Sequence, residues 1–286
     1  MAGGISQAFP APAKLNLFLH VVGRRADGYH LLQSVFRFID YADTVHLCLR
    51  DDGRVVREED LPGVPEERDL ALRAARLLQE VAPPGSGAGI RVEKRLPMGG
   101  GLGGGSSDAA TVLLALNRLW GLNLPRQRLQ ELALSLGADV PVFVFGRTAF
   151  AEGVGEMLSP VDVPPAWYVV LTPGVQVPTA DIFAAPELTR DTPAIKIARF
   201  SAGTGRNDLR GNDLQTAVVR RYPEVASHLE WLGQFGEARM TGSGACVFAA
   251  FDDEVTARAV LRGLPEGMQG FVARGLDRHP LYEYCA

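Results

Sequence analysis

One run of residues has the composition of a phosphate-binding loop. Six of the seven residues from Gly99 to Gly105 are glycine, and Ser106 and Ser107 follow. Glycine loses the most backbone entropy on folding, so such a run is favoured only where side chains must be absent and backbone N–H groups exposed. The apolar segment 109–120 predicts a helix directly behind the run, with its positive dipole end facing the same spot. The sequence therefore predicts a loop that holds a phosphate chain, with both serine hydroxyls directed at phosphate oxygens or a magnesium ion.

Other nucleotide motifs fit this run less well. A Walker loop ends in Gly-Lys followed by Ser or Thr, and no lysine stands here. Gly99, Gly101 and Gly104 spell the dinucleotide-binding pattern G-x-G-x-x-G, but segment 120–124, about 20 positions later, has no acidic residue to hold a ribose. The partner motifs of protein kinases are absent from the sequence. A nicotinamide-dependent oxidoreductase and a plain flexible linker are the alternative interpretations of the run.

A lysine and an aspartate stand in apolar segments, where burying a charge is costly unless the charge has a function. Asp139 precedes the apolar segment 140–144, where burying a carboxylate without a purpose is costly. It is our candidate base, and the alternative is an N-cap for a short helix that begins at Val140. Lys14 lies in segment 14–21, whose alternation predicts a half-buried strand with the lysine opposite the leucines. A rigidly placed catalytic cation and an ordinary solvated lysine are both compatible with that position.

The elements that must position these residues form a mixed α and β chain. Helices are predicted at 70–81, 109–120, 125–136, 214–222 and 223–235 and after Asp253, and strands at 14–21, 90–96 and 167–171 and on both sides of 241–245. Prolines crowd segment 160–165 and indicate a connection. We therefore predict two domains, an N-terminal nucleotide-binding domain at 1–159 and a C-terminal domain at 160–286.

Composition excludes several other classes of protein. The chain has 286 residues, 47% hydrophobic and 22% charged, as in ordinary globular proteins of two domains. A net charge of −4 offers no broad basic surface for nucleic acid. The three cysteines are far apart without C-x-x-C spacing, which argues against zinc and disulfides. No signal peptide or long apolar run is present, so we expect a cytoplasmic protein that does not enter membranes.

Three motifs, in the same order along the chain, resemble those of the GHMP small-molecule kinases. They are Pro12-Ala13-Lys14-Leu15-Asn16-Leu17, the segment from Pro97 through the glycine run to Ala110, and Thr241-Gly242-Ser243-Gly244-Ala245-Cys246-Val247-Phe248. The resemblance implies an α/β (α+β) chain of the GHMP kinase two-domain fold. Its N-terminal domain would be ribosomal-protein S5-like, its C-terminal domain ferredoxin-like, and ligands would bind between them. It also implies ATP as co-substrate, with Mg²⁺ arriving with ATP and no metal bound by the protein.

Further motifs are similar to one branch of this superfamily over nearly the whole chain. They are Asp27-Gly28-Tyr29-His30, the segment 137–143, and Pro178-Thr179 with Phe183. That branch phosphorylates the 2-hydroxyl of a methylerythritol that carries a cytidine diphosphate group, in the non-mevalonate isoprenoid pathway. The stretch 196–206 departs from the pattern. The implied partner is thus a small molecule with a cytidine diphosphate group, and we expect a monomer or a weak homodimer.

The resemblance implies roles for individual residues. Lys14 would lie beside Asp139, keep its carboxylate ionised and stabilise the transferring phosphoryl group. A cytosine ring stacks on aromatic faces, and the resemblance places Tyr29 and Phe183 against it and His30 in hydrogen bonding with it. The residues implied to bind the nucleotide are Pro97, Met98, Gly99, Gly100, Gly101, Leu102, Gly103, Gly104, Gly105, Ser106 and Ser107. Those implied to bind the substrate are Asn16, Tyr29, His30, Thr179, Phe183, Gly242 and Ser243.

Alternatives stay open at several of these positions. Phe183 fits ordinary core packing, Tyr29-His30 fits an exposed turn, and segment 242–244 fits a tight turn. The adenine pocket has candidates in segment 55–70 and near Asn117. For function, the alternatives are a GHMP kinase of homoserine, mevalonate or a sugar, and a nucleotide sensor without catalysis.

Overall fold

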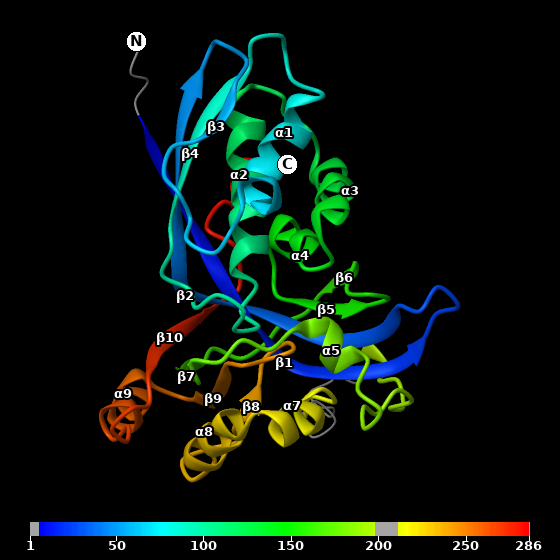
Figure 1. The fold of residues 1–286 in the computed structure, drawn as a ribbon, viewed down its shortest axis with the longest axis vertical. Coiled ribbons are helices and arrows are strands. Elements are labelled where there is room, and N and C mark those ends of the chain that lie inside the picture. The colour runs from blue at the N-terminus through cyan, green and yellow to red at the C-terminus, as the bar shows by residue number, and fades with distance from the viewer. Residues whose placement is uncertain (1–5, 198–210, 286) are drawn as a thin grey trace.

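Two long strands form an antiparallel hairpin that passes through the whole molecule. Strand β1 covers Gln7–Arg24 and β2 covers His30–Arg50 in the computed structural model, which describes residues 6–197 and 211–285. The register of the hairpin shifts at three places. Such irregularities bend a strand pair, and the hairpin curves from the helical N-terminal part into the C-terminal part (Figure 1).

Helices and short strands complete the N-terminal part around this hairpin. Its strands are β3 (Val55–Arg57), β4 (Gly87–Glu93), β5 (Ala149–Glu152) and β6 (Met157–Pro160), and its helices are α1 (Leu70–Gln79), α2 (Gly104–Leu119), α3 (Arg126–Leu136) and α4 (Val140–Phe145). The helices lie together on one side of the sheet (Figure 1). Helix α2 is buried continuously from Ser107 to Asn117, as its apolar sequence requires. The glycine run therefore leads into the centre of this part.

The C-terminal part has the chain order β-α-β-β-α-β. Its elements are β7 (Trp167–Leu171), α5 (Thr179–Phe183), α7 (Gln215–Arg221), α8 (Pro223–Gly233), β8 (Arg239–Met240), β9 (Val247–Phe251), α9 (Glu254–Arg262) and β10 (Gly270–Leu276). The strands pair in the antiparallel order β10-β7-β9-β8. This split arrangement is ferredoxin-like, which confirms the fold implied for this part. Short 3-10 helices lie at Glu66–Arg68 and Tyr282–Tyr284.

One sheet path connects the two parts. Gly275 and Leu276 of β10 pair with Ile39 and Phe38 of β2. Each part also has its own apolar core, one under α1–α4 and one under α7 and α8. No helix among the described residues is long and apolar enough to cross a membrane. The boundary predicted at residue 159 stays a prediction.

The predicted helices and strands are found, with different limits at the site. Helix α2 begins at Gly104 instead of residue 109, so the last glycines of the run form its first turn. The strand predicted at 14–21 is the middle of β1, and the prediction of a half-buried strand is wrong. Leu15 packs in a core with side chains of β7 and β9, and the opposite face is covered as well. Lys14 is consequently buried and not solvated.

Candidate active site

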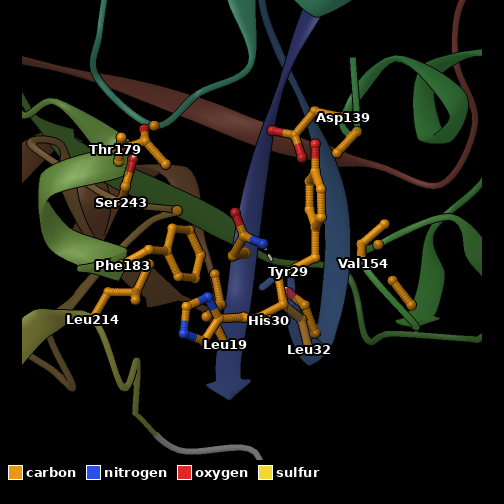
Figure 2. A pocket seen from close by; sticks show the side chains of 18 of the residues that line it. Leu19, Tyr29, His30, Leu32, Asp139, Val154, Thr179, Phe183, Leu214 and Ser243 are labelled. Atoms are coloured by element: carbon orange, nitrogen blue, oxygen red, sulfur yellow. Dashed lines mark hydrogen bonds between the residues drawn. The ribbon is translucent and has the colours of Figure 1, made fainter. Parts of the chain in front are cut away.

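A cavity of about 980 Å³ opens between the two parts of the chain. Its lining comes from segments that are far apart in the sequence: β1, the turn before β2, the glycine run, the residues before α4, helix α5 and the loop 242–244. In Figure 2, Asp139 and the pair Thr179 and Ser243 lie on one side of this space, and His30 and Phe183 lie on the other. The cavity therefore has a charged end and an aromatic end.

Lys14 and Asp139 form the charged end. Lys14 Nζ lies 3.3 Å from Asp139 Oδ2, and the side chains are 3% and 41% exposed. The buried ammonium also donates to Asn16 Oδ1 at 2.6 Å and lies 5.4 Å from the centre of the Phe36 ring. Three neighbours thus hold the lysine in place, while the carboxylate stays open to the cavity.

The N-cap alternative for Asp139 is not realised by its side chain. Asp139 does occupy the N-cap position of α4, but its side chain makes no capping hydrogen bond in the described structure. The turn of the chain at Gly137 and the helix that begins at Val140 place the carboxylate. The position is therefore fixed by the backbone, and the carboxylate oxygens remain available for Lys14 and a ligand.

The glycine run is shaped by close approaches that no side chain would permit. Gly101 and Gly103 have φ values of 76° and 74°, in the left-handed region. A Cβ on Gly101 would lie 2.2 Å from the carbonyl oxygen of Thr241, and one on Gly103 would lie 2.9 Å from Phe143 Cζ. Gly103 is the N-cap of α2, whose first N–H groups have no partner within the helix. This cradle fits an anionic phosphate chain by its backbone and by the helix dipole.

Only part of the predicted nucleotide-binding set lines the cavity. Gly99, Gly101 and Ser106 do, whereas Pro97, Met98, Gly100, Leu102, Gly103, Gly104, Gly105 and Ser107 are outside the described lining. Ser107 is buried and its Oγ donates to the carbonyl oxygen of Pro12 at 2.7 Å, so the role predicted for its hydroxyl stays a prediction. The Leu102 side chain lies in the core, and its carbonyl accepts the Lys14 N–H at 3.0 Å. These two residues support the loop from behind.

The aromatic end consists of His30 and Phe183, whereas Tyr29 lines the same cavity with its ring directed toward Asp139 (Figure 2). The rings of His30 and Phe183 stack with centroids 5.0 Å apart and an interplanar angle of 27°. Tyr29 is 66% exposed on the turn between β1 and β2, where its N–H donates to Asp27 at 3.2 Å. Phe183 also contacts the C-terminal core with part of its ring, so its packing and its place in the cavity coexist. The stacked rings of His30 and Phe183 provide flat surfaces for a planar group.

The loop 241–244 connects the cavity wall to β1 and to the glycine run. Thr241 Oγ1 accepts the N–H of Asn16 at 3.0 Å and donates to the carbonyl oxygen of Gly101 at 3.3 Å. Ser243 Oγ lies 2.7 Å from Thr179 Oγ1 of α5. Gly242 has a φ of 55°, and a Cβ at this position would lie 3.4 Å from Lys14 Nζ. The structure thus brings Asn16, Thr179, Gly242 and Ser243 together around one end of the cavity.

The sequence analysis missed a buried charge cluster behind the glycine run. Lys94 Nζ donates to Asp108 Oδ2 at 2.8 Å and also to Asp43, whose other oxygen accepts backbone N–H groups of the segment 95–96. Burial raises the pKa of Asp108, although Lys94 acts in the opposite direction. A Cβ on Gly104 would lie 3.2 Å from Lys94 Nζ. The cluster therefore fixes the first turn of α2, and its signals in the sequence are Lys94 shortly before the run and Asp108 directly after it.

The adenine-pocket candidate near Asn117 stays a prediction, and the Asn117 side chain itself has a structural role. This side chain is fully buried, where Nδ2 donates to the carbonyl of Leu124 and Oδ1 accepts the N–H of the same residue. Asn117 thereby closes the connection between α2 and α3. Segment 55–70, the other candidate, contains β3 and a 3-10 helix, and its role stays a prediction. In the described part of the chain, no group of three or more His, Cys, Asp or Glu could hold a metal ion.

The fold and this site define a GHMP small-molecule kinase. The model of the GHMP kinases N terminal domain matches residues 69–147, and that of the GHMP kinases C terminal domain matches residues 193–270. A crystal structure of mevalonate kinase superposes with a TM-score of 0.66 at 16% identity, covering 95% of this chain and 100% of the other, and it supports the fold.

Closer relatives narrow the assignment. The 4-diphosphocytidyl-2-C-methyl-D-erythritol kinase of Thiobacillus denitrificans is 77% identical, covering 98% of this chain and 99% of the relative, and that of Nitrosospira multiformis is 62% identical, covering 96% and 93%. A crystal structure of a 4-(cytidine 5'-diphospho)-2C-methyl-D-erythritol kinase superposes with a TM-score of 0.81 at 35% identity, covering 94% and 99%. The chain belongs to the 4-diphosphocytidyl-2-C-methyl-D-erythritol kinase family within the GHMP kinases.

Proposed function

We propose that this kinase transfers the γ-phosphoryl group of ATP to the 2-hydroxyl of 4-diphosphocytidyl-2-C-methyl-D-erythritol, giving the 2-phosphate and ADP. This is a step of the non-mevalonate isoprenoid pathway. The observation that carries the proposal is the pairing, in one cavity, of a Lys14–Asp139 ion pair with a His30–Phe183 stack. Homoserine, mevalonate and simple sugars carry no base, so the aromatic end favours a nucleotide-linked acceptor over them.

Phosphoryl transfer requires positioning and charge stabilisation more than covalent work by the protein. In the proposal, Asp139 accepts the proton of the substrate hydroxyl as its oxygen attacks the γ-phosphorus. Lys14 keeps that carboxylate ionised and balances the charge that develops on the phosphoryl oxygens. Asn16 holds Lys14 in place, since its Oδ1 accepts from Lys14 and its Nδ2 donates to Ser34 Oγ at 2.8 Å. The hydroxyl group needs no other proton acceptor.

The glycine run is the proposed site for the phosphates of ATP. The close approaches at Gly101 and Gly103 leave a cradle that only backbone lines, which fits a phosphate chain. Mg²⁺ would arrive with ATP and neutralise phosphate charge, and Ser106, which lines the cavity, is the described hydroxyl closest in sequence to the cradle. The cytosine ring would lie against Tyr29, His30 and Phe183 at the other end.

Release of ADP tests the proposal. The purified chain is incubated with Mg-ATP and, in separate reactions, with the cytidine-linked substrate, homoserine, mevalonate, galactose or no acceptor. The proposal predicts ADP release only with the cytidine-linked substrate. ADP release with another acceptor alone would contradict the cytosine site. The absence of ADP release in every reaction would contradict catalysis.

A further inference from the structure

Arg190 contacts both His30 and Phe183, the two residues of the aromatic end. Its guanidinium donates to the carbonyl oxygens of Phe183 at 3.0 Å, Ala185 at 2.7 Å and Leu188 at 3.0 Å, and its Nε donates to His30 Nε2 at 3.2 Å. One side chain thus anchors the end of α5, which carries the Phe183 ring, and the imidazole that stacks on this ring. The sequence analysis gave no role to this arginine.

The contact to His30 has a chemical consequence, because a guanidinium has N–H donors and no acceptor, and keeps its charge at any accessible pH. The nitrogen that faces Arg190 must therefore accept, so His30 Nε2 carries no hydrogen. A neutral imidazole has one N–H group, which then stands on Nδ1. Nδ1 has no hydrogen-bond partner in the described part of the chain. His30 lines the cavity, so it has one N–H donor left for a ligand.

The charge state of His30 agrees with this geometry. Burial lowers the pKa of His30, and the positive charges of Arg190 and Arg24 lower it further. The imidazole is thus held neutral near pH 7, with one donor and one acceptor, and the acceptor is used by Arg190.

We propose that Arg190 is a positioning residue that fixes the Nδ1–H tautomer of His30, and that this tautomer selects cytosine over uracil. The inference rests on the proposed function, because it requires a cytosine base beside His30. Ring nitrogen N3 is an acceptor in cytosine and an N–H donor in uracil. A fixed N–H donor on His30 can form a hydrogen bond with N3 of cytosine, but it would face the N3–H donor of uracil. A buried donor without an acceptor is costly, so uracil would bind more weakly.

Histidine side-chain NMR tests the tautomer directly. In ¹⁵N-labelled protein, long-range ¹H–¹⁵N correlations show which ring nitrogen carries the hydrogen. The chain has five histidines, and the loss of one set of signals in His30→Asn identifies His30. Wild type is expected to show the Nδ1–H form, and Arg190→Ala is expected to shift His30 to the Nε2–H form that a free imidazole favours. An Nε2–H form in wild type, or no shift in Arg190→Ala, would overturn the proposal.

Base preference tests the consequence. The ratio of kcat/KM for the cytidine-linked substrate to that for its uridine-linked analogue is expected to fall about tenfold in Arg190→Ala, chiefly through KM. An unchanged ratio would overturn the specificity role. If wild type used neither compound, the proposed function would fail, and calorimetric binding of cytidine diphosphate and uridine diphosphate would then decide the base preference separately.

Arg221→Ala is the matched control. Arg221 also anchors α5, since its guanidinium donates to the carbonyl oxygen of Asp181 at 3.2 Å and to Glu187 at 3.3 Å, but it makes no hydrogen bond to His30 in the described part of the chain. This variant is expected to keep the Nδ1–H signal and the wild-type base preference. If it lost both to the same extent as Arg190→Ala, the effect would come from loosening α5, which would contradict the role of the Arg190–His30 bond.

Discussion

Lys14 Nζ and Asp139 Oδ2 lie 3.3 Å apart, with the lysine buried and the aspartate open to the cavity. The lysine belongs to β1 and the aspartate to the N-terminus of α4, so the pair exists only after these elements have packed. This difference in exposure fits two different roles for the two residues. The buried cation is a fixed charge, and the exposed carboxylate can meet a substrate hydroxyl.

Asp139→Asn removes the proposed base with little change in shape. We expect kcat to fall about 10²- to 10⁴-fold, as is typical for the loss of a general base. The KM for ATP is expected to stay close to wild type, because the glycine run does not depend on this carboxylate. Steady-state kinetics with both substrates measures these values, and a variant with full kcat would remove Asp139 from the reaction.

Lys14→Met keeps most of the length of the side chain and removes its charge. We expect kcat to fall about 10²-fold or more, because a fixed charge at the transferring group is lost. In the double variant with Asp139→Asn, the losses should be far from additive, since the two residues act as a unit. Strict additivity of the two effects on kcat would show that they act independently.

Phe183→Ala removes one face of the aromatic end. The KM for the cytidine-linked substrate is expected to rise about tenfold with little change in kcat, because base–aromatic stacking contributes about 1–3 kcal/mol. Phe235→Ala is the matched control, as Phe235 is 46% exposed and contacts Trp231 at the end of α8. An unchanged KM in Phe183→Ala would take this ring out of the substrate site.

The sequence motifs made the site residues predictable, whereas the contacts that complete the site could not be predicted from the sequence. Glycine runs and isolated charges carry local signals, and they indicated Lys14, Asp139 and the phosphate loop. Strand β2 was missed because polar side chains interrupt its apolar pattern. Arg37, for example, is 1% exposed in β2 and donates to Thr148 at 3.2 Å and to Asp277, which lie far along the chain.

Arg190 shows the same limit of sequence patterns at the cavity wall. It donates to three carbonyl oxygens, which every residue type carries, and to one ring nitrogen of His30. No local pattern of residue types identifies such acceptors. The contact of Ser107 was missed for a related reason, because its partner is the carbonyl oxygen of Pro12 in another element.

Gly101→Ala tests the contact between the glycine run and the loop 241–244. The new Cβ would lie 2.2 Å from the carbonyl oxygen of Thr241 at a φ of 76°, so the two segments must separate. We expect a loss of kcat/KM for ATP of about 10²-fold, since a misplacement of about 1 Å costs that much. Gly233→Ala, at the end of α8 with no atom within 4 Å of the new Cβ, is the control expected to behave as wild type. Equal activity of both variants would contradict the account.

His279 makes the stability of the fold depend on pH. Burial, together with the charge of Arg126, lowers the pKa of His279 from 6.5 to about 3. Below pH 6.5 the unfolded chain binds a proton that the folded chain does not, so stability falls as the pH decreases toward 3, by about 1.4 kcal/mol per pH unit. His279→Asn keeps an acceptor for the N–H of Leu281. Urea unfolding at pH 7 and pH 5 should show a shallower loss in this variant, and an equal loss would rule out His279 as the cause.

Phosphorus NMR of the reaction product tests the central claim most directly. Wild type is incubated with Mg-ATP and 4-diphosphocytidyl-2-C-methyl-D-erythritol, and Asp139→Asn serves as the comparison. The account predicts one new phosphomonoester signal, equimolar with ADP, without splitting by a proton on the carbon that bears it, because carbon 2 carries a methyl group and no hydrogen. It predicts that this signal is absent from Asp139→Asn on the same time scale. A split signal from phosphorylation at another hydroxyl, or equal product from both proteins, would contradict the account.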